Sequence, residues 1–155
     1  MVTIEDTIVV NAPAAVVWRA IADPAAHASW HPFVTGIRGE HALGASRSCS
    51  VIVGRKRGET TERCVEHDEP QRIAWLIEAD STGFSRMVSD WRSGFSLEQR
   101  DGATLVTAHS AFEPRRLLLR VMQPFVRRKF HQTQRAILAG LKSAVEDEQR
   151  AAAAA

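Results

Sequence analysis

The fold of this chain is decided by one stretch near its C-terminal end, residues 124–148, which reads PFVRRKFHQTQRAILAGLKSAVEDE. Apolar side chains recur here on one side, as in an amphipathic helix with one buried face. Such a helix is about 37 Å long at the standard rise per residue. Because a chain of this size folds into a globule with a radius of gyration of roughly 15 Å, the helix must cross nearly the whole molecule. A curved sheet that grips the helix would bury its apolar face.

The rest of the chain predicts that sheet. Residues 2–10 are rich in β-branched side chains and indicate a first strand. Two cap-and-proline signals, at residues 11–13 and 23–24, predict two short helices, of which the second ends near Trp30. From Phe33 to Glu113 the pattern alternates with period two, apart from glycines that interrupt its beginning. It predicts strands at 46–53, 59–67, 73–79, 87–99 and 104–112 and turns at 55–58, 68–71 and 100–103.

Together these patterns predict an α+β fold, in which a curved antiparallel sheet of about six or seven strands wraps around a long C-terminal helix. Pro114 should open the last element, and Pro124 should kink or restart the helix because a proline removes one helical hydrogen bond. We expect residues 1–150 to form one domain. The alanine tail at 151–155 is expected to be disordered or to extend the helix.

Composition excludes several classes of protein. Twenty basic and 18 acidic residues give a net charge of +2, too mild for a concentrated nucleic-acid-binding face. No apolar run is long enough for stable membrane insertion, and the first residues lack the pattern of a secretory signal. Cys49 and Cys64 are too few for a disulfide framework. We therefore expect a cytoplasmic protein, either a monomer or a homodimer, that binds no nucleic acid.

The residues with reactive side chains indicate no familiar catalytic motif. The glycines do not form a phosphate loop, and the serines lack the context of a nucleophile elbow. His27 and His31 have metal-ligand spacing, but Pro32 ends their helix, so a surface or pocket-rim position is favoured. The polar cluster around Cys64 and His67 indicates a solvated turn. The sequence thus predicts no metal site and no cofactor.

The basic residues of the C-terminal helix give it a charged side. The ordinary interpretation is a solvated helix face, and the functional alternative is attraction to an acidic carrier protein or to anionic lipid. These residues are Arg127, Arg128, Lys129, Arg135 and Lys142.

Aromatic residues are the main candidates for function. Trp30, Trp75 and Trp91 lie in segments that can face the interior between sheet and helix. They either fill the core or line an apolar ligand pocket with a few polar groups. His31 is the first candidate for a polar contact at the mouth of such a pocket, whereas His109 falls on the outward face of its strand.

Several short motifs, in this order and spacing, resemble the START-like or SRPBCC superfamily of helix-grip proteins, which includes the polyketide cyclase/dehydrase and lipid-transport group. The resemblance covers Ile4 to Glu148. Its carriers are Ala12–Trp18, Trp30–Phe33, Glu69–Trp75, Phe95–Glu98, Asp101–Thr107 and Leu138–Lys142.

The resemblance implies a hydrophobic cavity that binds, and in some members transports, a lipid, polyketide or aromatic metabolite. It carries no universal catalytic motif, so the catalytic residues stay unassigned. This sequence has no tyrosine and no obvious inward arginine or acid. A polyketide aromatase/cyclase or dehydratase that positions its substrate is therefore the alternative hypothesis, and a protein-interaction module is the third. The candidate ligand-binding residues are Trp30, His31, Phe33, Trp75, Trp91, Phe95, Ser110, Phe112, Met122, Phe125, Val126 and Phe130.

Overall fold

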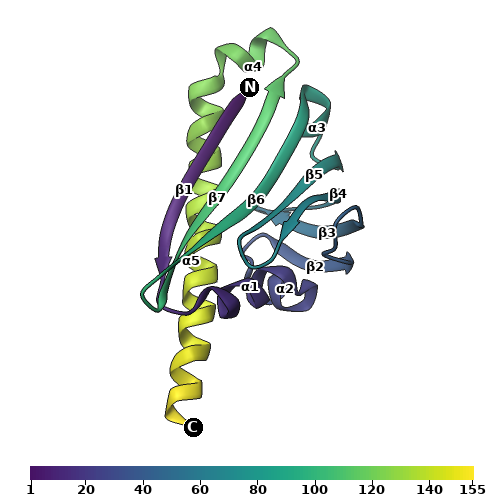
Figure 1. The fold of residues 1–155 in the computed structure, drawn as a ribbon. Coiled ribbons are helices and arrows are strands. Elements are labelled where there is room, and N and C mark those ends of the chain that lie inside the picture. Colours follow the sequence, from purple (N-terminus) through teal and green to yellow (C-terminus); the bar gives the residue numbers. More distant parts are fainter.

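The computed structural model describes residues 1–155 and confirms the predicted architecture, a curved antiparallel sheet around a long C-terminal helix (Figure 1). The seven strands follow the order β1-β7-β6-β5-β4-β3-β2, so the first strand pairs with the last. The strands are β1 (Val2–Val10), β2 (Val34–Gly39), β3 (Ser46–Val53), β4 (Lys56–Asp68), β5 (Arg72–Asp80), β6 (Val88–Arg100) and β7 (Ala103–Pro114). The helices are α1 (Ala14–Ala22), α2 (Pro24–Trp30), α3 (Phe84–Met87), α4 (Leu117–Val121) and α5 (Gln123–Ala154).

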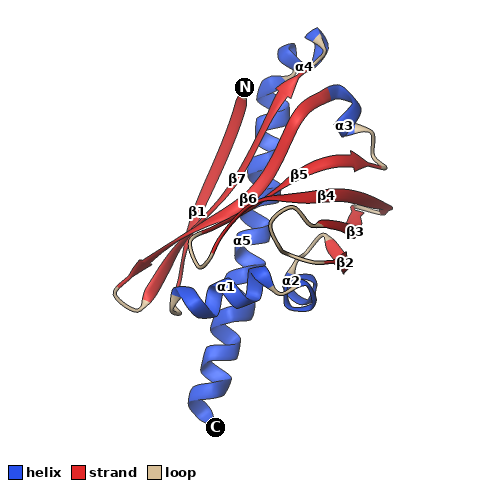
Figure 2. Ribbon diagram, turned by 45° about the vertical axis from the view of Figure 1, so that its right-hand side comes forward, coloured by secondary structure: helices blue, strands red, loops and turns tan.

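The two short helices form where the cap signals predicted them. Pro13 is the N-cap of α1, and Pro24 occupies the first turn of α2. The Asp23 carboxylate accepts a hydrogen bond from the backbone N–H of Ala25 at 3.3 Å, which satisfies one free donor at the start of α2. This pair of helices lies across one end of the curved sheet, beside α5 (Figure 2).

Three predicted boundaries are wrong in detail. The β3–β4 hairpin turns between Val53 and Lys56, two residues before the predicted turn, with Gly54 in the left-handed conformation (φ +64°) that suits a tight turn. β7 continues to Pro114, because a strand end tolerates a residue without an N–H. A short helix, α3, occupies part of the stretch between β5 and β6 that the alternation left unassigned. Pro124 restarts the helix, as it lies in the first turn of α5.

The long helix is packed tightly against the sheet along only part of its length. Its buried residues, Gln134, Leu138, Leu141 and Val145, all lie at position 134 or later. The three apolar ones join the larger core cluster, which also includes Trp75 and residues of α1 and α2, whereas a smaller cluster forms around Phe112 and Leu119 near α4. Between residues 129 and 137, one side of α5 leaves room between the helix and the sheet.

Candidate functional site

A cavity of about 360 Å³ lies in that room, between the inner face of the sheet and α5. Nine of its 21 lining residues are apolar or aromatic and supply most of its surface, and the polar ones include a charged group at the end formed by α2, β3 and β4. This composition is typical of a small-molecule site, although the volume is near the lower end of the usual range of about 300–1,000 Å³. The lining residues are His27, His31, Phe33, Val34, Arg47, Val51, Val53, Gly54, Thr60, Glu62, Trp75, Ile77, Asp80, Thr82, Trp91, Ser93, Phe95, Lys129, Gln132, Thr133 and Ile137.

An ion pair between neighbouring strands forms the polar end. Nε and Nη2 of Arg47 lie 2.7 and 2.5 Å from Oε2 of Glu62, and the two side chains are only 6% and 12% exposed. Thr60 Oγ1 donates to the other carboxylate oxygen at 3.0 Å. Because ions this deeply buried have lost most of their hydration, these hydrogen bonds are what makes the pair tolerable.

The guanidinium of Arg47 has two further neighbours. Its Nη1 donates to Nε2 of His41 at 2.7 Å, and its Cζ lies 3.7 Å from the centroid of the Trp75 ring. A guanidinium has five N–H donors, and the contacts with Glu62 and His41 occupy three of them. Two donors are left, so the site holds a fixed positive charge with spare hydrogen-bonding capacity beside an apolar wall.

Three histidines surround this arginine, and burial keeps all of them neutral. Burial first, and the Arg47 charge second, lower the pKa of His31 to about 3 and that of His41 to about 4. The same two causes lower the pKa of His27 well below its ordinary value. A charged imidazole is disfavoured here because it would lose hydration and face a guanidinium.

The hydrogen bonds fix which ring nitrogen of each histidine carries the proton. Nδ1 of His27 and of His41 donate to the Ile21 carbonyl at 2.9 and 3.2 Å. Nδ1 of His31 instead accepts from the backbone N–H groups of Phe33 and Val34, both at 3.1 Å. A neutral His31 must then carry its proton on Nε2, which makes that nitrogen a donor at the cavity wall.

Side chains in and beside the cavity wall carry buried polar atoms that have no partner. The indole Nε1 atoms of Trp75 and Trp91 are buried without an acceptor. Oε1 of Gln134 is likewise unpaired, although its Nε2 donates to Ser110 Oγ at 3.0 Å. Trp91, Ser110 and Gln134 line an adjoining hollow of about 130 Å³ that shares five residues with the main cavity. Buried groups of this kind usually have a partner, so a ligand acceptor would satisfy both indoles.

The structure distributes the predicted residues among five places. His31, Phe33, Trp75, Trp91 and Phe95 line the main cavity, and Ser110 and Phe130 line the adjoining hollow. Met122, Phe125, Val126 and Phe130 line a separate groove at the start of α5. Phe112 is buried in the smaller core cluster. Trp30 is in the larger cluster, where its Nε1 donates to the Ala20 carbonyl at 2.8 Å.

The charged end of the cavity was not predicted from the sequence. The expectation that no arginine or acid points inward is wrong, because Arg47 and Glu62 are both buried. The predicted turn at 55–58 would pair Arg47 with Glu66, whereas the observed turn pairs it with Glu62. Alternation along 46–53 does place Arg47 on the same face as buried Cys49, and this was the available signal.

Two other expectations were wrong because they treated polar residues as exposed. His27 is 2% exposed and lies within the cavity wall rather than at the surface or the pocket rim, since its ring packs against Trp75 with centroids 5.7 Å apart. Cys64 is 1% exposed in the core, not in a solvated turn. No three His, Cys, Asp or Glu side chains gather so as to hold a metal ion.

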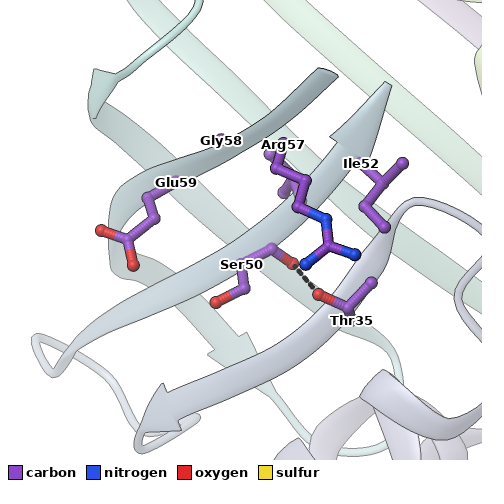
Figure 3. Close-up of a pocket in the computed structure, with 7 residues that line it drawn as sticks. Thr35, Ser50, Ile52, Arg57, Gly58 and Glu59 are labelled. Carbon is purple, nitrogen blue, oxygen red and sulfur yellow. Dashed lines mark hydrogen bonds between the residues drawn. The ribbon is translucent and has the colours of Figure 1, made fainter. Parts of the chain in front are cut away.

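A second hollow lies on the outer side of β3 and β4 (Figure 3). Its volume is about 530 Å³, but only Val51 and Ile52 among its seven lining residues are hydrophobic. Thr35 Oγ1 donates to the Ser50 carbonyl at 3.3 Å across it. Because Ser50 and Ile52 alternate with the inward residues of β3, this hollow faces away from α5 and is a weaker candidate for a ligand site.

Comparison with known proteins agrees with the geometry. The model of the polyketide cyclase / dehydrase and lipid transport family matches residues 1–146. The chain belongs to this family. No curated protein sequence matches it significantly.

Solved structures of family-like proteins share the fold at low sequence identity. The Zhui aromatase/cyclase from a Streptomyces species is 21% identical, with a TM-score of 0.78 and 97% of each chain covered. A START superfamily protein from Mycobacterium smegmatis is 17% identical, with a TM-score of 0.76 over 94% of this chain and 97% of its own. A norcoclaurine synthase mutant from Thalictrum, bound to a transition state analogue, is 11% identical, with a TM-score of 0.71 and 96% of each chain covered. At these identities the likeness establishes the helix-grip fold of this family member and no activity.

Proposed function

We propose that this family member binds, and carries, a small and mostly apolar molecule with at least one oxygen acceptor in the cavity between the sheet and α5. The observation that carries the proposal is a set of donors without a partner on side chains that line the cavity. These are the Nε1 atoms of Trp75 and Trp91 and the two spare N–H groups of Arg47. A lipid, polyketide or aromatic metabolite with a carbonyl, phenolate or carboxylate group fits this description.

The expected affinity follows from the cavity and its donors. Burial of about 300 Å² of apolar ligand surface contributes about 7 kcal/mol, at 25 cal/mol per Å². Association costs at least about 4 kcal/mol of this, which leaves millimolar binding. A neutral hydrogen bond adds about 1 kcal/mol and one to a charged group adds about 2–3 kcal/mol. Both indoles and the guanidinium together would therefore bring the affinity into the micromolar range.

The test begins with native mass spectrometry of protein purified under non-denaturing conditions, followed by solvent extraction to identify any released molecule. Trp91→Phe then keeps the apolar ring and removes only the unpaired N–H, so it should weaken binding by about 2- to 12-fold. Trp18→Phe is the control, because Trp18 is buried in the core and does not line the cavity. An unchanged affinity in folded Trp91→Phe and Trp91→Ala variants would refute this assignment of the site.

A second candidate function, cyclisation or dehydration of a bound polyketide, is favoured by the charged end of the cavity. Arg47 would stabilise negative charge that develops on a ligand carbonyl, as a preorganised donor in a water-poor site does. The Nε2–H of neutral His31 would supply a second hydrogen-bond donor to that oxygen. Turnover of a poly-β-ketone substrate that Arg47→Met/Glu62→Leu abolishes, without loss of folding or of apolar binding, would support catalysis over carriage alone.

A further inference from the structure

Large apolar side chains stand exposed at one end of the molecule. Leu117, Leu118, Val121 and Phe125 are 68–74% exposed, and Met122 is 43% exposed. They belong to α4 and the first turn of α5, at the end of the molecule opposite the C-terminus (Figures 1 and 2). We call residues 115–129 the tip. A monomeric soluble protein seldom exposes so many neighbouring apolar side chains, and such a patch usually marks an interaction surface.

A groove of about 460 Å³ runs beside these side chains, between α3, α4 and α5. Eight of its ten lining residues are hydrophobic. The lining residues are Phe84, Met87, Arg116, Leu118, Leu119, Met122, Phe125, Val126, Lys129 and Phe130.

The tip is also the most basic part of the chain. It carries six positive charges and no acidic residue, and no Asp or Glu occurs from Pro114 to Val145. Because the net charge of the whole chain is +2, the residues outside the tip have a net charge of −4. The acidic residue nearest to the tip in the sequence is Glu113, and its carboxylate is paired with the N-terminal amine at 2.8 Å. The basic residues are Arg115, Arg116, Arg120, Arg127, Arg128 and Lys129.

These charges are not neutralised within the protein. None of the six basic side chains of the tip forms an ion pair, and only Arg127 makes a side-chain hydrogen bond, to the Thr3 carbonyl at 3.0 Å. Elsewhere the arginines are commonly paired, as Arg63 is with Glu78. The tip thus presents unpaired positive charge around projecting apolar side chains.

We propose that the tip docks on the surface of a membrane that contains anionic lipids. The exposed leucines, valine and phenylalanine would enter the interfacial region, while the arginines would meet lipid phosphates, which is how amphipathic surface segments bind. No helix of the protein is long and apolar enough to cross a membrane, so the attachment is peripheral. The proposal goes beyond ligand binding and does not depend on it.

Charge distinguishes this occupant from a second copy of the chain. A symmetric dimer through the tip would place six positive charges opposite six others with no carboxylate among them. An acidic protein would match the charges, but the high exposure of Phe125 and Leu118 favours a partner that can also take up projecting apolar groups.

The tip also adjoins the ligand cavity. Lys129 lines both the groove and the cavity. Phe84, Trp91 and Phe130 form an aromatic partition between the two, with ring centroids 4.9 Å apart for Phe84–Trp91 and 5.6 Å apart for Phe84–Phe130. Docking would therefore hold the cavity next to the lipid surface.

The test is co-sedimentation of the full chain with vesicles of phosphatidylcholine alone and of phosphatidylcholine with phosphatidylglycerol at roughly two to one. Arg116→Glu/Arg120→Glu should lower partitioning to the anionic vesicles at least about 25-fold, since each basic residue contributes about fivefold. Arg55→Glu/Arg57→Glu changes the net charge equally in the β3–β4 hairpin and should have a much smaller effect.

The apolar contribution is tested separately. Leu118→Ser/Phe125→Ser should lower partitioning about tenfold or more, because both side chains would leave the lipid. Leu43→Ser is the matched control, since Leu43 is also 68% exposed but lies far from the tip in the sequence and does not line the groove. Circular dichroism verifies that each variant is folded.

Three outcomes would overturn the proposal. The first is wild-type protein that stays in the supernatant with anionic vesicles. The second is a pair of tip variants that sediment like the wild type. The third is binding to polyglutamate as tight as to vesicles and unaffected by Leu118→Ser/Phe125→Ser, which would assign the tip to an acidic protein partner. Partitioning that follows both anionic lipid and the two tip variants supports membrane docking.

Discussion

Replacing Arg47 by methionine should strongly destabilise the protein, although Met keeps an apolar stem over the Trp75 ring. The substitution leaves the Glu62 carboxylate 12% exposed with no countercharge and removes the donor to Nε2 of His41. Breaking one partner of a buried pair typically costs about 3–5 kcal/mol. The total free energy of unfolding of a domain of this kind is about 5–15 kcal/mol, so the loss is a large fraction of its stability.

The same structure predicts that removing both charges restores most of that loss. Arg47→Met/Glu62→Leu replaces the pair by apolar side chains of similar size, which is commonly neutral or stabilising. Urea unfolding at neutral pH, followed by circular dichroism, gives the free energies of the two single variants and the double variant. The single variants should not add, because each leaves a buried partner that the double variant lacks.

A surface pair on β4 and β5 provides the comparison. Nη2 of Arg63 lies 2.6 Å from Oε1 of Glu78, but these side chains are 51% and 32% exposed. Arg63→Met should therefore cost no more than about 1 kcal/mol. Equal costs for Arg47→Met and Arg63→Met, or additive effects of Arg47→Met and Glu62→Leu, would refute the argument that burial makes the Arg47–Glu62 pair important.

Three further predictions concern pH, packing and thiol chemistry. Burial lowers the pKa of His31 in the folded protein to about 3, whereas in the unfolded chain it is about 6.5. The unfolded chain therefore binds more protons between these two pH values, and the stability of the protein falls as the pH drops below about 6.5. His31→Asn, which keeps an acceptor for the backbone donors, should reduce the loss in unfolding free energy between pH 6.5 and 4.5 by about 2–3 kcal/mol. Gly94→Ala should destabilise by about 2–3 kcal/mol in urea unfolding, because its Cβ would lie 2.3 Å from a backbone oxygen of β5. Burial raises the pKa of Cys49 to about 11 and that of Cys64 above its ordinary value, so neither thiol should react with Ellman's reagent at pH 8 until the protein is unfolded.

Each of these has a result that contradicts it. A His31→Asn variant with the wild-type pH dependence would show that His31 is charged in the folded state. Gly36→Ala is the packing control, since nothing lies within 4 Å of its Cβ, and a cost equal to that of Gly94→Ala would exclude the proposed clash. One rapidly labelled thiol per folded chain would show that a cysteine is accessible.

Local patterns determined the elements of this protein and their order. The bounds of β1, α1 and α2 follow from β-branched runs and from prolines at helix starts, which act over a few residues. The long apolar stripe of α5 required a gripping sheet, because no smaller arrangement buries it. The Asp101-Gly102 turn likewise fixed the β6–β7 hairpin.

Only the tertiary structure decided what lines the cavity. A turn displaced by two residues changes the partner of Arg47 from Glu66 to Glu62, because the residue numbers of a paired hairpin have a constant sum. Whether small residues such as Ser93 and Ser110 leave a void depends on how closely α5 approaches them. The alternation of polar and apolar residues along a strand does not predict that distance. The burial of His27 was likewise decided by the tertiary structure. Its ring packs edge-on against Trp75 and Phe95, which belong to strands that meet α2 only in the folded chain.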